Sequence, residues 1–189
     1  MSDSMLTVSM RINGSDTEPA DLPEDLMLLE YLQEYLNLTG TRYGCGQGVC
    51  RACAVIHDGA NGPEVIAACI TGVAWANGRS FRTIEGHASR DIEGNVTQLT
   101  AVQQAFLDHF SFQCSYCTPG FVAAATALVE RLEAAPVARD AVEETVLNAL
   151  NPNICRCTGY VRYLEATRDV ILSTPGLTTE EVAERDAQP

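Results

Sequence analysis

Tyr43-Gly44-Cys45-Gly46-Gln47-Gly48-Val49-Cys50-Arg51-Ala52-Cys53 is the most informative segment of this 189-residue chain. Its cysteines have the spacing C-x4-C-x2-C, and a fourth, Cys69, follows 16 positions after the third. Glycine allows positive φ angles and close backbone approach, so the alternating Gly44, Gly46 and Gly48 let successive N–H groups turn towards an anion. The segment predicts a loop that holds a negatively charged group through several thiolates.

The eight cysteines of the chain form two groups of four. The first group has the spacing of a plant-type 2Fe–2S ferredoxin, and the second consists of two close pairs, C-x2-C and C-x-C. Four thiolates are the ligand set of one 2Fe–2S cluster. The sequence therefore predicts two clusters, one held by Cys45, Cys50, Cys53 and Cys69, the other by Cys114, Cys117, Cys155 and Cys157.

Three other interpretations of the cysteines compete with this one. A disulfide scaffold is typical of short, secreted chains with few core residues, which this chain does not resemble. Two structural zinc sites are a more serious alternative, because paired C-x2-C motifs also bind zinc. Three cysteines crowded into one short loop fit the usual zinc knuckles poorly, and unliganded core cysteines would not cluster in this way. The spacing favours iron–sulfur clusters.

Composition and charge exclude several classes of partner. Hydrophobic residues make up 46% of the chain and charged residues 20%, which is enough apolar surface for a buried core. The net charge is −13 and all 12 positive residues are arginines, so a nucleic-acid or anionic-membrane partner is not expected. No apolar stretch approaches the roughly 20 residues of a membrane span. Neither a basic-then-apolar leader nor a twin arginine is present, which predicts a cytoplasmic location, or a periplasmic one if a signal-bearing partner exports the chain.

Periodicity in the first half of the chain predicts strands around one helix. Residues 6–12 alternate apolar and polar and end at the turn Asn13-Gly14-Ser15, after which a second strand is expected near residues 18–22. Helical spacing covers residues 26–36, and further strands are expected at 54–56, 65–69 and 81–84. We expect Trp75 in the core of this part. The pattern predicts a β-grasp, ferredoxin-like domain over residues 1–85.

The second half is predicted to be helical. Residues 86–98 lack apolar periodicity and are interpreted as a linker. Apolar stripes at helical spacing then recur around residues 101–110, 121–132, 141–149 and 161–171, which predicts a four-helix bundle over residues 99–173 that holds the second cluster at its helix junctions. Residues 174–189 are expected to be an acidic, solvated tail. The fold class predicted for the whole chain is α+β.

Several longer motifs carry a resemblance to a known family. In the first half these are Leu38-Thr39-Gly40-Thr41-Arg42-Tyr43-Gly44-Cys45 and Thr83-Ile84-Glu85-Gly86. In the second half they are Val102-Gln103-Gln104-Ala105-Phe106, Gln113-Cys114, Cys117-Thr118-Pro119-Gly120-Phe121 and Asn153-Ile154-Cys155-Arg156-Cys157-Thr158-Gly159-Tyr160. With these motifs the chain closely resembles the small iron–sulfur subunit of the molybdenum hydroxylases, the xanthine dehydrogenase and aldehyde oxidoreductase family. The resemblance covers residues 6–172.

The resemblance implies a place in an electron-transfer chain. It implies a large catalytic partner subunit that carries molybdopterin, with Gln113 and Cys157 as the positions that approach the pterin. Electrons would pass through the second and then the first cluster to a flavin subunit or a cytochrome c. The assembled complex would be an aldehyde or N-heteroaromatic hydroxylating dehydrogenase, and this chain would contain no catalytic residue. The alternatives are a free-standing two-cluster carrier and, less favoured, a zinc-stabilised interaction module.

Two positions depart from the family pattern. Arg51 stands where the family usually has glycine between the second and third cysteines, and Ser115 replaces a glycine after Cys114. Neither change removes a cysteine. An arginine beside the first cluster adds positive charge and is expected to raise its reduction potential.

Overall fold

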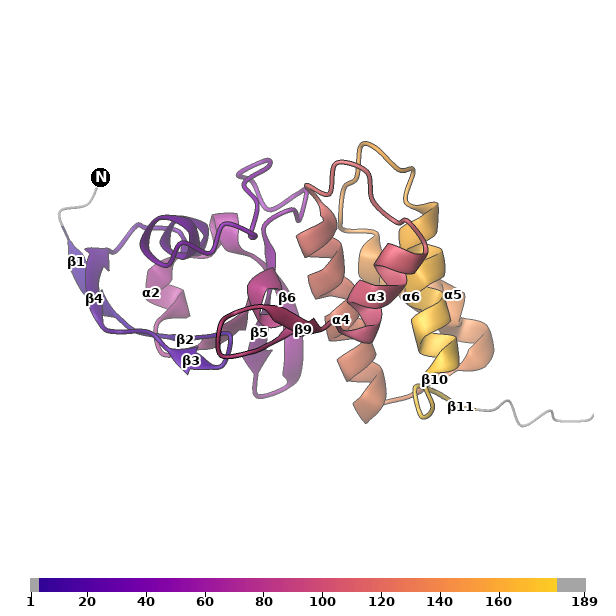
Figure 1. Cartoon of the computed structure of the whole chain (residues 1–189). Coiled ribbons are helices and arrows are strands. Elements are labelled where there is room, and N and C mark those ends of the chain that lie inside the picture. Colours follow the sequence, from indigo (N-terminus) through magenta and orange to yellow (C-terminus); the bar gives the residue numbers. More distant parts are fainter. Residues whose placement is uncertain (1–3, 180–189) are drawn as a thin grey trace, which may run out of the picture.

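The computed structural model describes residues 4–179, and these form two units that lie side by side (Figure 1). Strands and short helices make up the first unit, and four helices dominate the second. This arrangement confirms the predicted α+β class. The two units meet along helix α4, which lies between the sheet and the remaining helices (Figure 1).

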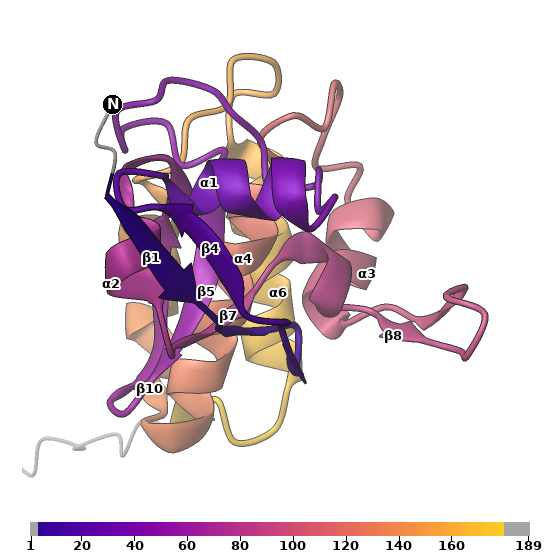
Figure 2. The same cartoon turned by 90° about the vertical axis from the view of Figure 1, so that its left-hand side faces the viewer.

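The first unit is built on a five-stranded sheet with the order β3-β2-β7-β5-β6. Strands β2 and β7 are parallel, and the other neighbours are antiparallel. The strands are β2 (Arg11–Ile12), β3 (Ser15–Asp16), β5 (Ala54–Gly59), β6 (Gly62–Ala67) and β7 (Ser80–Arg82). A separate antiparallel pair, β1 (Met5–Val8) and β4 (Ala20–Pro23), continues this layer (Figure 2).

Short helices cover the sheet. The predicted helix over 26–36 is present as α1 (Leu28–Glu30), which continues into a π-helical segment at Tyr31–Tyr35. Its buried face packs on the sheet and contributes Leu28, Leu29 and Leu32 to the core of the first unit. The remaining short elements are 3-10 turns at Ala68–Ile70 and Ile84–Gly86 and helix α2 (Val73–Ala76).

Trp75 lies at the margin of this core and not in it, which contradicts the expectation from sequence. Helix α2 leaves 44% of the residue exposed. One face of the indole lies under the guanidinium group of Arg79, 4.3 Å from the ring centroid, and the ring of His57 packs against the indole in an edge-type arrangement. The buried aromatic at this place in the core is Phe81.

The connection between the units is partly ordered. Within the segment interpreted as a linker, β8 (Ser89–Arg90) and β9 (Val96–Gln98) form a short hairpin that projects from the body of the molecule (Figure 2). Asp91 closes its turn by accepting hydrogen bonds from the backbone N–H groups of Glu93 and Asn95. Side-chain acceptors of this kind stabilise a turn even where the sequence has no apolar periodicity. The hydrophobic pattern therefore did not predict the hairpin.

The second unit is a four-helix bundle. Its helices are α3 (Ala101–Asp108), α4 (Thr118–Ala134), α5 (Val142–Leu150) and α6 (Val161–Ser173). Their apolar faces share one core, with Phe106, Phe121 and Tyr163 at its centre and the rings of Phe121 and Tyr163 stacked at 4.1 Å. After a 3-10 turn at Arg139–Ala141, α5 leads towards the second cysteine pair. Residues 174–179, expected to belong to a solvated tail, are ordered instead, because Leu177 is buried in the core of the helical unit and β11 (Thr178–Thr179) pairs with β10 (Val137–Ala138). Residues 180–189 of the expected tail lie outside the described part.

The contact between the units is apolar at its centre and ionic at one end. Ala123 and Ala127 of α4 pack against Ala54 and Ile56 of β5, and such small side chains allow close approach of helix and sheet. At the far end of α4 the guanidinium group of Arg82 donates hydrogen bonds to the carboxylates of both Asp58 and Glu130, at 2.6 to 3.1 Å. These contacts fix one unit against the other.

Within residues 4–179, none of the helices has the length and apolar character needed to cross a lipid bilayer.

Candidate metal centres

The segments that carry the cysteines come together at one end of the molecule, at the top of Figure 1. The first group occupies the loop between α1 and β5, completed by Cys69 in the turn after β6. Cys114 and Cys117 lie between α3 and α4, and Cys155 and Cys157 lie between α5 and α6. Both groups thus sit on loops held by rigid elements, as is usual for functional sites.

In the first group, backbone N–H groups point at the sulfur atoms. The Sγ atom of Cys45 accepts hydrogen bonds from the N–H of Cys50 at 3.4 Å and from that of Gln47 at 3.3 Å. These hydrogen bonds lower the pKa of Cys45 to about 6, which favours a thiolate at neutral pH. A thiolate is the form of cysteine that binds a metal.

Cys53 of the same group is buried, and burial raises its pKa to about 12. The neighbouring thiol of Cys69 adds to this effect. A buried sulfur without a positive partner stays protonated, whereas a coordinating metal deprotonates a thiol outright. The pocket around Cys53 is therefore suited to a metal-bound thiolate and unsuited to a free one.

The loop glycines lie where side chains would collide. A Cβ atom on Gly44 would stand 2.8 Å from the Sγ atom of Cys50, so this backbone passes directly beside a cysteine sulfur. Gly46 and Gly48 have φ angles of +67° and +71°, in the left-handed region that favours glycine. The conformation brings the N–H groups of this loop towards Cys45, as expected from the Gly-rich sequence.

In the second group the four sulfurs form an exposed pair and a buried pair. The Sγ atoms of Cys114 and Cys157 are 3.5 Å apart and both residues are exposed, whereas Cys117 and Cys155 are buried. Burial raises the pKa of Cys117 to about 12. Burial acts in the same direction on Cys155, but hydrogen bonds from the hydroxyl of Thr158 and from nearby backbone N–H groups outweigh it and lower that pKa.

The arrangement of the sulfurs can be compared with the needs of a single metal ion and of a cluster. A structural zinc ion needs four ligands converging on one point. Within the described residues, no three Cys, His, Asp or Glu side chains converge in this way. Thiols arranged two by two fit a 2Fe–2S cluster, in which four cysteines are shared between two irons. The donor set of both groups thus fits such a cluster.

The two sites touch each other through their backbones. The N–H of Ile154, next to Cys155, donates a hydrogen bond of 3.0 Å to the carbonyl oxygen of Cys50. Gly120 of α4 lies so close to the carbonyl oxygen of Arg51 that a Cβ atom at this position would collide with it. The hydroxyl of Tyr116 donates to the carbonyl oxygen of Tyr43 across the same boundary. A hollow of about 350 Å³ lined by cysteines of both groups lies between them.

The structure also places Gln113, singled out in the sequence, and two of the histidines. Gln113 is exposed on the loop before Cys114. Of the histidines, His57 packs against Phe81 in the first unit, and His109 lies 3.3 Å from the carboxylate of Asp169 at the end of α3.

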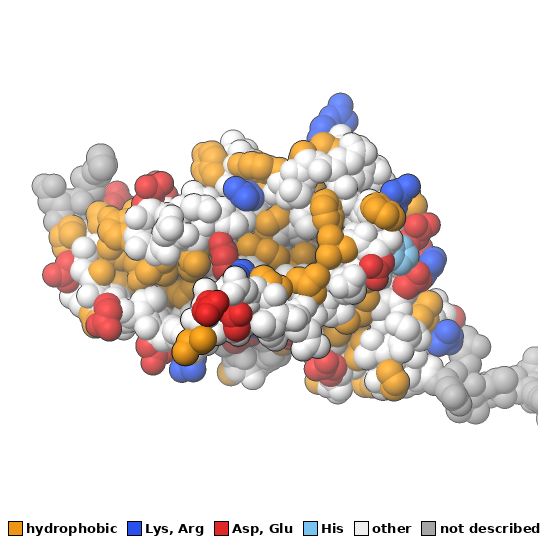
Figure 3. Space-filling model, viewed as in Figure 1, with side chains coloured by type: hydrophobic (Ala, Val, Ile, Leu, Met, Phe, Trp, Pro, Cys, Tyr) orange, Lys and Arg blue, Asp and Glu red, His pale blue; other side chains and the backbone are white. Residues whose placement is uncertain are grey.

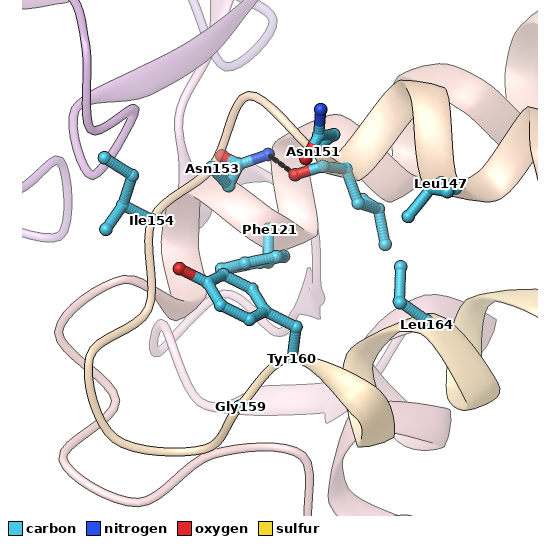
Figure 4. A pocket seen from close by; sticks show the side chains of 9 residues that line it. Phe121, Leu147, Asn151, Asn153, Ile154, Gly159, Tyr160 and Leu164 are labelled. Atoms are coloured by element: carbon cyan, nitrogen blue, oxygen red, sulfur yellow. Dashed lines mark hydrogen bonds between the residues drawn. The ribbon is translucent and has the colours of Figure 1, made fainter.

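A second hollow, of about 410 Å³, opens beside the loop that carries Cys155 and Cys157 (Figure 4). The rings of Phe121 and Tyr160 form its floor, and Leu147 and Leu164 face each other across its mouth (Figure 4). Asn153 borders it and is fixed by a hydrogen bond from its Nδ2 atom to the carbonyl oxygen of Leu150.

Fold and sites together define a two-domain iron–sulfur protein. Residues 10–74 match the family described as the 2Fe-2S iron-sulfur cluster binding domain, and residues 83–168 match that described as the 2Fe-2S binding domain.

The chain is 36% identical over 162 residues to one of the nicotinate dehydrogenase subunits of Pseudomonas putida, covering 86% of this chain and 92% of that protein. It is 38% identical over 170 residues to the nicotine 6-hydroxylase small subunit of Paenarthrobacter nicotinovorans, covering 89% of each. Quinoline 2-oxidoreductase from Pseudomonas putida 86 has a similar fold, with a TM-score of 0.71 and 33% identity over 87% of this chain and 91% of that one. The chain belongs to the family of small iron–sulfur subunits of the molybdenum hydroxylases.

Several contacts at the sites were not predicted from the sequence. They are the hydroxyl of Tyr163, 3.8 Å from the Sγ atom of Cys117, the hydroxyl of Thr158, 3.1 Å from that of Cys155, and the hydrogen bond between Ile154 and Cys50. Thr158 follows a cysteine pair directly, so its position in sequence was a usable signal. Tyr163 lies on α6 and reaches its cysteine only through the packing of the helices.

Proposed function

We propose that this chain carries electrons from the molybdopterin centre of a large catalytic subunit to a flavin subunit or a cytochrome c. The observation that carries this proposal is the hydrogen bond between Ile154 and Cys50, which links the two cysteine groups directly. Two one-electron carriers in such contact can take up, one at a time, the two electrons that a hydroxylation releases. The chemistry of oxygen insertion belongs to the molybdenum cofactor when it is bound in the partner.

We assign the ligands by the pairing of the sulfurs. One iron of the first cluster would be held by Cys45 and Cys50 and the other by Cys53 and Cys69, because the thiols of each pair are neighbours. The same reasoning assigns the second cluster to the following pairs: Cys114 with Cys157, and Cys117 with Cys155.

The exposure of the sulfurs supports a direction for the electrons. Cys114 and Cys157 face outward, whereas Cys155 is buried and adjoins Ile154, which contacts the first group. Electrons would enter at the exposed pair, with Gln113 and Cys157 nearest the pterin, and leave the second cluster through its buried pair. The substrate class, an aldehyde or an N-heteroaromatic compound, would be selected by the catalytic subunit.

Two matched variants of the assembled complex test this order. Cys157→Ser should remove the electron paramagnetic resonance signal of the second cluster and stop reduction of the first cluster by substrate. Cys69→Ser should remove the signal of the first cluster and leave reduction of the second by substrate intact. The wild-type chain should contain four irons and four acid-labile sulfides.

Three results would contradict the proposal. The first is substrate-driven reduction of the first cluster at the wild-type rate in Cys157→Ser. The second is a native chain that migrates alone without molybdenum, which would favour the free-standing carrier. A colourless protein containing zinc would be the third.

A further inference from the structure

We infer that Glu85 is a positioning residue for the first cluster: its carboxylate fixes the start of the first cysteine loop and thereby helps to set the reduction potential of that cluster. This inference rests on the proposed function and adds a residue outside the cysteine loops to it. Its basis is a set of hydrogen bonds around the motif Thr83-Ile84-Glu85-Gly86, a segment that contains no cysteine.

The carboxylate of Glu85 holds together two segments that are far apart in the chain. Its Oε1 atom accepts a hydrogen bond of 2.7 Å from the backbone N–H of Gly40, at the start of the loop that carries Cys45. Its Oε2 atom accepts a hydrogen bond from the hydroxyl of Thr83. A carboxylate has two acceptor oxygens, so this one side chain serves both donors at once.

Thr83 is itself fixed to the sheet of the first unit. It directly follows β7 and is 1% exposed. Its backbone N–H donates a hydrogen bond of 2.8 Å to the Oδ1 atom of Asn13, and the Nδ2 atom of Asn13 donates one of 2.9 Å to its hydroxyl oxygen. The backbone N–H of Asn13 donates in turn to the carbonyl oxygen of Phe81. The Glu85 carboxylate is therefore anchored to a rigid element through a connected network.

The backbone of Gly40 lies directly against the turn Ile84–Gly86. A Cβ atom on Gly40 would stand 2.7 Å from the Oε1 atom of Glu85 and would collide with the side chain of Ile84. Ile84 also packs against the core of the helical unit, and hydrophobic side chains follow the boundary between the units on the face drawn in Figure 3. The turn thus contacts both units and the start of the cysteine loop.

The residues that follow Gly40 transmit its position to the cluster site. The carbonyl oxygen of Thr41 accepts a hydrogen bond from the side chain of Gln33, and the N–H of Arg42 donates one of 3.3 Å to the carbonyl oxygen of Ala52. The chain then reaches Cys45, whose Sγ atom accepts hydrogen bonds from N–H groups of the loop. A displacement at the start of the loop would therefore change the hydrogen bonds to a ligand sulfur.

Glu85 acts on the first cluster in two ways, and these have opposite signs. Hydrogen bonds from the loop to ligand sulfurs stabilise the reduced, more negative cluster and raise its reduction potential. A loop released at Gly40 would donate weaker bonds, which lowers the potential. The negative charge of the carboxylate destabilises the reduced cluster, so removing the charge alone raises the potential. The sign of the shift therefore separates the effect of position from the effect of charge.

Two variants of the assembled complex measure the effect of position. Glu85→Ala removes both hydrogen bonds and the charge. Glu85→Gln removes the charge but keeps an acceptor oxygen for the N–H of Gly40, and its amide group can donate to the hydroxyl oxygen of Thr83. Redox titration with chemical mediators, followed by electron paramagnetic resonance, gives the potential of each cluster. We expect a lower potential of the first cluster in Glu85→Ala than in Glu85→Gln, and an unchanged second cluster in both.

Two further variants complete the test. Asp91→Ala is the matched control, because Asp91 also accepts hydrogen bonds from backbone N–H groups but lies in the projecting hairpin (Figure 2), and both clusters should keep their wild-type potentials. Thr83→Val keeps the charge of Glu85 and removes one of the two hydrogen bonds that orient its carboxylate. It should lower the potential of the first cluster alone, and it decides the test if Glu85→Ala does not assemble.

Three results would overturn the inference. The first is a potential of the first cluster in Glu85→Ala equal to or above that in Glu85→Gln, because Glu85 would then act through its charge alone or have no effect. The others are equal shifts of both clusters and a wild-type potential in Thr83→Val. Titration with mediators does not depend on substrate, so failure of the proposed electron path, seen as absent reduction of the clusters by substrate, is a separate result.

Discussion

At the scale of single residues, Arg51 is the departure with the clearest physical consequence. It lies between two cysteines of the first site, and its backbone has a φ angle of +58°, in the left-handed region that favours glycine. A side chain kept at such a position despite the strain has a candidate function. Here the side chain would add a positive charge close to the cysteines that we assign to the first cluster.

We predict that Arg51→Gly lowers the reduction potential of the first cluster. Removing a cation from the neighbourhood destabilises the reduced, more negative state, by an amount on the order of tens of millivolts. A redox titration followed by electron paramagnetic resonance measures the shift, with Arg139→Gly as the distant control. An unchanged potential in Arg51→Gly would refute the charge argument. The same variant should be slightly more stable to heat, because glycine adopts this φ without strain.

His87 is the second residue with a measurable consequence. Burial lowers its pKa from 6.5 to about 4, the nearby Arg82 acts in the same direction, and Glu130, Asp58 and Glu85 oppose the shift. Its Nε2 atom is buried without a hydrogen-bond partner among the described residues. The folded protein therefore keeps this imidazole neutral.

The sign of the pH dependence follows from that pKa. Between pH 6.5 and about 4 the unfolded chain binds a proton at His87 that the folded chain does not, so stability falls as the pH falls through this window. The loss approaches about 3 kcal/mol at its lower end. Urea unfolding of wild type and His87→Gln across this range measures it. The variant should have a flatter profile, and parallel profiles would contradict the assignment.

At the scale of elements, the contact between α4 and the first cysteine loop requires a residue without a side chain at position 120. Gly120 lies in the first turn of α4, and its neighbour is the backbone carbonyl of Arg51 and not a flexible side chain. A backbone obstacle cannot rotate away, so any side chain at this position forces the helix and the loop apart.

We predict that Gly120→Ala destabilises the protein by about 1–3 kcal/mol and slows electron transfer between the clusters. Displacing α4 would lengthen or break the hydrogen bond between Ile154 and Cys50. Thermal unfolding and the rate of reduction of the first cluster after the second provide the two measurements. Gly72→Ala is the control, since the nearest atom to its new Cβ is 4.0 Å away. If Gly120→Ala has the thermal stability and the electron-transfer rate of wild type, α4 does not pack closely against the carbonyl of Arg51 in solution.

At the scale of the whole molecule, Arg82 ties the far ends of the two units together. Its guanidinium group neutralises Asp58 on β5 and Glu130 on α4, and these carboxylates raise its pKa. Removing the cation would leave two carboxylates near each other at the boundary of the units.

Arg82→Met should therefore lower stability by about 1–2 kcal/mol, a value discounted because all three side chains are partly exposed. Calorimetry should show the lower transition temperature, and weaker magnetic coupling between the reduced clusters should report the looser arrangement. Arg131→Met, beside Glu130 on the exposed face of α4, is the matched control. If both variants behave alike, the network does not fix the units.

Some features of the fold and of the cysteine sites could be predicted from the sequence, and others could not. The spacing of the cysteines, the apolar periodicity and the glycine loop were enough to predict two cluster sites, the fold class and four helices, because these depend on residues close together in the chain. The prediction that Trp75 lies in the core was wrong, because the apolar character of a residue does not show which face of a short helix packs against the core. The hairpin over residues 89–98 was not predicted because hydrogen bonds to a polar side chain stabilise its turn, and such bonds leave no apolar periodicity in the sequence.

Cysteine spacing alone was sufficient to assign each thiol to its group and to predict two clusters. It could not predict that Cys114 and Cys157 are exposed while Cys117 and Cys155 are buried, or that Ile154 contacts Cys50; these arise from the folded arrangement. The reason is physical: ligand spacing is a local property, whereas the contact between two sites and the charge of a surface arise from packing of segments about 100 residues apart.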